Sequence, residues 1–145
     1  QINKHISLTL NNKKCIQNNH NDRCSYNGNG RDRNLFADVI KSKFVYFHQT
    51  QSGGALHITN CGVKCKNAQF RDCQANPGGG GAIYIKNTIS LSNNVDHENL
   101  NFVECQAVFG GAIYVYSDSE RNSVNIVKCS FSRNSLILET GRENG

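Results

Sequence analysis

Short stretches in which apolar and polar residues alternate recur along the chain, and each follows a pair of glycines. Apolar side chains at every second position are typical of a strand with one buried face, because successive side chains of a strand point to opposite sides. The leucine or isoleucine and the next isoleucine or valine are expected to share the buried face, with alanine and histidine or tyrosine on the other. The three stretches are Gly53-Gly54-Ala55-Leu56-His57-Ile58, Gly80-Gly81-Ala82-Ile83-Tyr84-Ile85 and Gly110-Gly111-Ala112-Ile113-Tyr114-Val115.

A second motif, a phenylalanine followed three residues later by cysteine or asparagine, keeps the same spacing. Its copies are Phe70-x-x-Cys73, Phe102-x-x-Cys105 and Phe131-x-x-Asn134. Because the phenylalanines fall at 70, 102 and 131 and the glycine pairs begin at 53, 80 and 110, two independent motifs share one period of roughly 30 residues. Such a period indicates a solenoid of stacked repeats. In that arrangement the phenylalanines form one interior ladder and the Cys/Asn positions a second, while the glycines open each strand at a sharp turn.

Other segments complete the repeat. A further strand per repeat is expected at 63–66, 89–92 and 124–127, with loops of variable length around them, including 93–99 and 117–123. Residues 5–10 alternate as a strand, and residues 136–139 also read as one. Phe44 or Phe47 is the candidate phenylalanine of a degenerate earlier repeat. The stretch from 11 to 34 is polar and irregular, as expected for the atypical end of a stack.

Together these patterns predict an all-β fold, a right-handed single-stranded parallel β-helix of about four coils of roughly 30 residues. Residues 1–35 are expected to form an N-terminal cap or atypical first coil. Residues 36–145 are expected to form the coils, cut short at the C-terminal end.

Composition agrees with this fold and excludes some functions. Thirteen glycines and many asparagines disfavour helices. The net charge of +5 is scattered along the chain, without the basic stripe that nucleic-acid binding requires, so no nucleic-acid partner is expected. No apolar run approaches the roughly 20 residues that span a bilayer, so no membrane insertion by this segment is expected.

The combination of Gly-Gly-Ala-Ile/Leu and Phe-x-x-Asn over about residues 44–145 resembles the repeats of the chlamydial polymorphic membrane proteins. It is also similar to repeats of β-helical surface proteins of protists such as trichomonads. Cys73 and Cys105 depart from the asparagine of that pattern. The resemblance implies an extracellular or cell-surface module of adhesin type.

The seven cysteines leave at least one without a partner inside the chain. Cys15 and Cys24 bracket an irregular polar loop and are one candidate disulfide; Cys61 and Cys65 are another. Cys73 and Cys105 are expected roughly 4.8 Å apart on neighbouring coils, as stacked thiols whose parallel side chains suit a disulfide poorly. His57 with Cys61 and Cys65 lacks a fourth zinc ligand, so no metal or other cofactor is expected.

An enzyme is also not expected. Asp72 and Glu104 are the carboxylates that a sugar-cleaving β-helix would need, but Arg71 and Arg133 beside them favour an outward charged row.

The expected function is a non-catalytic extracellular module that binds a protein or glycan on a cell surface. The side chains expected to contact the partner are Tyr84, Tyr114 and Tyr116, together with loops 86–99 and 117–123. The alternative is a structural β-solenoid that self-associates into a filament or coat, and a third reading is a pectin lyase-like enzyme.

Overall fold

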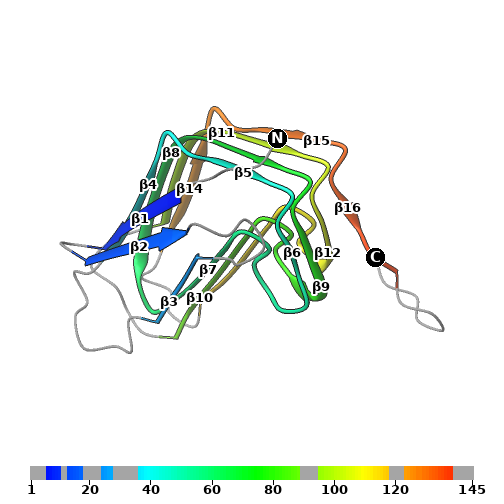
Figure 1. Cartoon of the computed structure of the whole chain (residues 1–145), viewed down its shortest axis with the longest axis horizontal. Coiled ribbons are helices and arrows are strands. Elements are labelled where there is room, and N and C mark those ends of the chain that lie inside the picture. Colours follow the sequence, from blue (N-terminus) through cyan, green and yellow to red (C-terminus); the bar gives the residue numbers. More distant parts are fainter. Residues whose placement is uncertain are drawn as a thin grey trace.

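The computed structural model describes residues 6–10, 13–17, 24–27, 36–88, 95–117 and 123–138. Over these residues the chain winds into a parallel β-helix whose three sheets enclose one apolar core (Figure 1). The predicted fold class, an all-β parallel β-helix, is confirmed. All regular elements of the described residues are strands, so this part of the chain contains no helix long and apolar enough to cross a membrane.

Sheet A is the largest of the three sheets. It contains β1 (Ile6–Leu10), β2 (Lys13–Gln17), β4 (Phe36–Ile40), β5 (Lys43–Val45), β8 (Gly62–Arg71), β11 (Val95–Val103), β14 (Val124–Val127) and β15 (Ser130–Ser132). Sheet B contains β3 (Cys24–Asn27), β7 (Leu56–Thr59), β10 (Ile83–Asn87) and β13 (Ile113–Ser117). Sheet C contains β6 (His48–Gln49), β9 (Gln74–Gly79), β12 (Gln106–Phe109) and β16 (Ser135–Leu136).

The residues that pair between neighbouring strands of sheet A give the length of each turn. Phe44 pairs with Phe70, Phe70 with Phe102 and Phe102 with Phe131, so successive turns take 26, 32 and 29 residues. Four parallel rungs on each sheet therefore make about three complete turns of about 29 residues. Phe44, and not Phe47, is the phenylalanine of the first repeat.

Four corners per turn bend sheet A or connect the sheets. In the described turns each of the first three has a residue with positive φ, and the fourth, from sheet B back to sheet A, has one at Asn60. Glycine adopts this conformation cheaply, whereas side chains with a Cβ adopt it at a cost. At one corner a glycine is also needed for space, because a Cβ on Gly54 would collide with the carbonyl oxygen of Gly81 in the next turn. The positive-φ residues are Lys41, Asn67, Asn99 and Lys128 at the first corner, Tyr46, Asp72, Glu104 and Arg133 at the second, Gly53, Gly80 and Gly110 at the third, and Asn60 at the fourth.

The core contains the phenylalanines and the inward aliphatic side chains of sheet B. The rings of Phe44, Phe70, Phe102 and Phe131 stack nearly parallel, with centroids 4.7, 5.0 and 5.0 Å apart. Leu56 and Ile58 are fully buried, as the alternating pattern predicts for sheet B. Ala55 is buried as well, so its expected outward position is wrong: it lies in the corner before β7 begins, where strand alternation does not yet apply.

Sheet A differs from the prediction in the third turn. Val95 pairs with Val63 on one side and with Val124 on the other, so the equivalent of 63–66 and 124–127 in this turn is 95–98 and not 89–92. Residues 95–99, predicted as a loop, therefore belong to β11, while 89–94 lie outside the described residues. The strand expected at 136–139 overlaps the observed β16 only at Leu136, because β16 comprises Ser135 and Leu136 alone; residue 139 lies outside the described residues.

The N-terminal end is built differently from the turns that follow. Strand β1 pairs antiparallel with both β2 and β4, and β3 adds a parallel rung to sheet B. The predicted irregular stretch therefore contains two strands. Much of residues 1–35 lies outside the described residues, so the boundary of a separate cap remains a prediction.

Candidate binding face on sheet B

A row of aromatic rings lies along the outer face of sheet B. His57, Tyr84 and Tyr114 occupy equivalent positions of β7, β10 and β13, and their neighbours Leu56 and Ile58 point into the core. In-register parallel strands lie about 4.8 Å apart, close to the separation of stacked rings. The His57 and Tyr84 centroids are 5.0 Å apart at an interplanar angle of 4°, and those of Tyr84 and Tyr114 are 5.3 Å apart at 9°.

Three further side chains extend this row into a patch, called here the aromatic face. The ring of Phe109, 43% exposed, meets Tyr114 edge-on with the centroids 4.9 Å apart. Tyr116 is also exposed, and the Nζ atom of Lys86 lies 5.6 Å from the centre of its ring. This is a cation–π arrangement. The aromatic face therefore comprises His57, Tyr84, Lys86, Phe109, Tyr114 and Tyr116.

Sequence reasoning identified the tyrosines but missed Phe109. A signal exists in the sequence: Phe109 stands directly before a glycine pair, where the preceding repeat has Gly79. The two positions are also neighbours in space, because a Cβ on Gly79 would collide with the Phe109 ring. The glycine of one turn thus makes room for the aromatic ring of the next.

The aromatic face is suited to binding rather than to covalent chemistry. Burial, reinforced by the neighbouring Tyr114, raises the pKa of Tyr84, so its phenol stays neutral and can donate a hydrogen bond. Because the rings stack on one another, their edges and the tyrosine hydroxyl groups face outward, where they can pack against the apolar face of a sugar or of a side chain and hydrogen-bond at its rim. Lys86 adds a single positive charge.

The carboxylates considered for catalysis lie at the second corner, away from this face. The Nε2 atom of His48 is 3.2 Å from Asp72, and Glu104 is 3.9 Å from Arg71 and 3.6 Å from Arg133. Each carboxylate is therefore engaged by a cationic or protonatable neighbour on an exposed corner, the arrangement of a charged outward row. That the chain is not an enzyme stays a prediction.

The Cys/Asn positions form an interior column next to the phenylalanines. Cys73 donates a hydrogen bond from Sγ to Phe44 O at 3.6 Å, and Cys105 does the same to Phe70 O at 3.7 Å. Asn134 donates from Nδ2 to Phe102 O at 3.1 Å and also accepts from the Cys105 amide at 2.8 Å. All three side chains thus bind the phenylalanine carbonyl of the turn before them. Burial raises the pKa of Cys73 well above its usual range, so it remains a neutral donor.

Cys61 and Cys65 are separate buried thiols rather than a disulfide. Cys61 donates from Sγ to Gly62 O at 3.2 Å, and burial raises the pKa of Cys65 above its usual range. His57 faces outward, so it does not converge with these two thiols. Within the described ranges no group of three or more His, Cys, Asp or Glu side chains is placed to hold a metal ion. The side chains of Cys15 and Cys24 lie outside the described residues, and their disulfide stays a prediction.

His97 is an interior residue that sequence reasoning placed in a loop. Its side chain is 1% exposed, and neither ring nitrogen has a hydrogen-bond partner among the described residues. Burial lowers its pKa to about 4, so the ring is neutral near pH 7. The alternation of Val95 and His97 was the available signal, because it matches Val63 and Cys65 of the turn before.

No protein-family model, curated protein or solved structure matches this chain. The repeat motifs and the geometry of the aromatic face are therefore the basis for a functional proposal.

Proposed function

We propose that this chain is a non-catalytic, extracellular or cell-surface binding module of adhesin type. Its partner is a protein or glycan on a cell surface, and the contact is made by the aromatic face of sheet B. One observation carries the proposal: stacked rings run along the outer surface of three consecutive strands, where folding alone does not require them. Aromatic side chains of this kind supply large contact areas with little loss of side-chain entropy.

The shape of the aromatic face favours an extended partner. Its rings repeat at 5.0 and 5.3 Å across the strands, so the contact surface is a row of ring edges rather than a pocket. A glycan chain or an extended peptide that lies across β7, β10 and β13 can contact several of these rings at once. The resemblance of the Gly-Gly-Ala-Ile/Leu and Phe-x-x-Asn motifs to those of the polymorphic membrane proteins supports the extracellular location.

The test compares the chain with Tyr114→Ala, because Tyr114 contacts both Tyr84 and Phe109 and is the centre of the face. Binding of labelled protein is measured on an array of oligosaccharides and extracellular-matrix proteins. For each ligand that the unmodified chain binds, we expect the affinity to fall at least about tenfold, as for a central aromatic residue of an interface.

The matched control is Tyr46→Ala. Tyr46 is another exposed tyrosine in a ring stack, with its centroid 4.2 Å from that of His48, but it lies at the second corner. The control should bind like the unmodified chain. Equal losses in both variants, or unchanged binding by Tyr114→Ala, would remove the aromatic face as the site. Circular dichroism checks that both variants retain their strands.

A further inference from the structure

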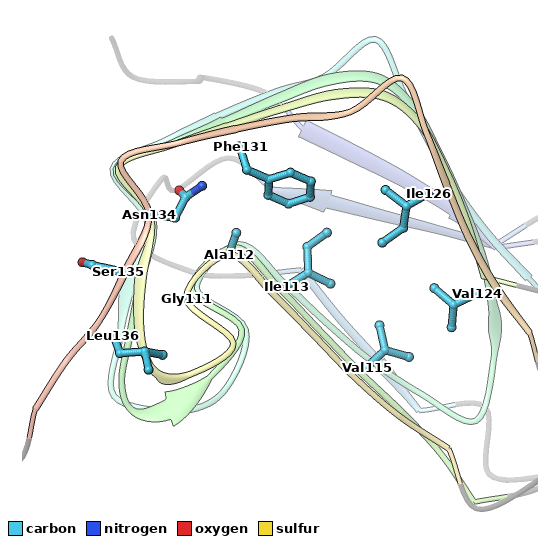
Figure 2. Close-up of a pocket in the computed structure, with 10 residues that line it drawn as sticks. All are labelled: Gly111, Ala112, Ile113, Val115, Val124, Ile126, Phe131, Asn134, Ser135 and Leu136. Carbon is cyan, nitrogen blue, oxygen red and sulfur yellow. The ribbon is translucent and has the colours of Figure 1, made fainter. Parts of the chain in front are cut away.

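The C-terminal end of the β-helix is an exposed apolar layer around a cavity of about 690 Å³ (Figure 2). Its lining includes Ile113, Ile126 and Phe131, and none of the described side chains that line it is charged. Nothing in this layer selects one kind of partner over another. The aromatic face of sheet B is different, because it combines aromatic rings with a charge of one sign.

The outer side of sheet B is free of acidic residues in the three strands that form the aromatic face. The outward side chains of β7, β10 and β13 are His57, Thr59, Tyr84, Lys86, Tyr114 and Tyr116. Lys86 is exposed, and none of the ion pairs of the described residues includes it. An anionic ligand on these strands would therefore meet an ammonium group that has no carboxylate of its own.

The outer side of sheet A is the opposite case. Lys66 of β8 and Glu98 of β11 form an ion pair there, with Nζ and Oε1 3.4 Å apart. Asp96 accepts a hydrogen bond from Nδ2 of Asn125 at 2.7 Å. The charges of sheet A are thus matched within the chain, whereas the charge of Lys86 on sheet B is not. This difference makes the aromatic face, and not sheet A, complementary to an anion.

The stacked rings add to this complementarity. An aromatic ring carries partial negative charge on its faces and partial positive charge at its edge. The rings of His57, Tyr84 and Tyr114 cover one another's faces, with centroids 5.0 and 5.3 Å apart, so their positive edges point outward. The phenol groups of both tyrosines can also donate hydrogen bonds to an anion. The face therefore offers ring edges, hydroxyl donors and one ammonium group.

The position of the aromatic face favours a glycan over a peptide. Extended peptides commonly bind by adding a strand to the edge of a sheet, where their amide and carbonyl groups find partners. The aromatic face is the broad side of sheet B, and the backbone of β10 is already paired with β7 and β13. A peptide on this side would leave its own backbone groups without matching partners, which is unfavourable. A sugar chain has no amide backbone, and its apolar C–H surfaces can pack against ring edges.

We propose that the ligand of the aromatic face is an acidic glycan, a chain of sugars that carries uronate carboxylates. Lys86 and Tyr84 lie two residues apart on the same side of β10, so both can bind one carboxylate while the neighbouring sugars pack along the ring edges of Tyr84 and Tyr114. This inference rests on the proposed function and specifies the chemistry of its partner.

Hyaluronan and alginate oligosaccharides are the probes, because their only anionic groups are uronate carboxylates. The methyl ester of each oligosaccharide keeps every sugar and removes the charge. Isothermal titration calorimetry measures the ratio of the affinities for acid and ester. For at least one of the two glycans, we expect the unmodified chain to bind the acid at least about tenfold more tightly than the ester. This ratio should fall at least about fivefold in Lys86→Gln and should be largely restored in Lys86→Arg.

The matched control is Lys66→Gln, which removes the same charge from an exposed lysine of sheet A. It should keep the acid-to-ester ratio of the unmodified chain. An equal fall in Lys66→Gln would mean that net charge alone causes the preference, and would overturn the inference. So would the absence of binding to both acids, or acids bound no more tightly than their esters. Polyglutamate of similar length that binds as tightly as the glycans would assign the face to acidic peptides instead.

Tyr114→Ala separates a failure of this inference from a failure of the proposed function. If acid and ester bind equally and Tyr114→Ala weakens both, the aromatic face is a binding site and only its preference for acidic glycans is wrong. If Tyr114→Ala weakens neither, the binding lies elsewhere and both proposals fail. The inference is supported when Tyr114→Ala weakens binding of acid and ester alike, while Lys86→Gln reduces the preference for the acid.

Discussion

Two columns of residues run side by side along the inner side of sheet A, and they differ in chemistry. The first, the phenylalanine column, contains Phe44, Phe70, Phe102 and Phe131. The second, the mixed column, contains Val39, Cys65, His97 and Ile126. Both are fully buried or nearly so in the inner turns, and both follow the same strand register.

The difference shows which interior positions a β-helix repeats and which it leaves variable. Flat rings 4.7 to 5.0 Å apart stack face to face, so each ring is the surface on which the next one packs. A smaller residue in that column would leave a gap between two rings. In the mixed column no such stack exists, and residues of different shape succeed one another, including one imidazole that has no hydrogen-bond partner in the described part of the chain.

The largest effect is expected when the phenylalanine column is interrupted. Phe102→Ala removes a fully buried ring from between Phe70 and Phe131. The free energy of unfolding should fall by about 3–5 kcal/mol, the usual loss for a buried phenylalanine with its cavity. Denaturant titration followed by circular dichroism measures it. Phe131→Ala, at the half-exposed end, should cost clearly less; equal losses would mean that stacking does not propagate along the column.

Acid should weaken the mixed column through His97. Its pKa is about 4 in the folded protein, below the value of about 6.5 for an unfolded histidine. Between these values the unfolded chain binds a proton that the folded chain excludes. The contribution to stability is therefore complete above about pH 6.5 and falls by about 3 kcal/mol as the pH decreases to about 4. Denaturant titrations from pH 7.5 to 4 measure the slope.

His97→Ile places the residue of the next turn in the same column and should flatten this pH dependence. It should also raise stability at pH 7 by about 1–3 kcal/mol, because the unpartnered ring nitrogens are removed from the core. His48→Gln is the control, since His48 is exposed at the second corner. If the acid slope persists in His97→Ile and disappears in His48→Gln, the assignment to His97 is wrong.

The smallest effect concerns the thiols next to the phenylalanine column. Cys105→Asn introduces the side chain found at Asn134, which binds both a phenylalanine carbonyl and a cysteine amide of the preceding turn. Stability should change by less than about 1 kcal/mol, because the new amide replaces the thiol hydrogen bond to Phe70 O. Cys105→Ala should be less stable than Cys105→Asn by thermal unfolding. The reverse order would show that volume, and not hydrogen bonding, decides this position.

Periodic features were predictable from the sequence, and features of single turns were not. The glycine pairs and the Phe-x-x-Cys/Asn motif predict the β-helix and its period because the same local conformation recurs in every turn. His97 was assigned to a loop because the turn that contains it is 32 residues long and its extra residues conceal the register. Phe109 was missed because its position is not aromatic in the repeat before it.

The sequence by itself determined the parallel β-helix, its period, the glycine corner before each strand of sheet B and the alternation between core and surface within those strands, because these depend on short-range periodicity. It did not predict the strands β9 and β12 of sheet C. Only the tertiary structure decided which residues of different turns meet. It placed Phe109 against Tyr114, left His97 buried without a hydrogen bond, and ended the core in an open apolar layer around Phe131. The physical reason is that contacts between turns depend on the number of residues in each turn, and turns of 26, 32 and 29 residues reach the same register through loops of different length.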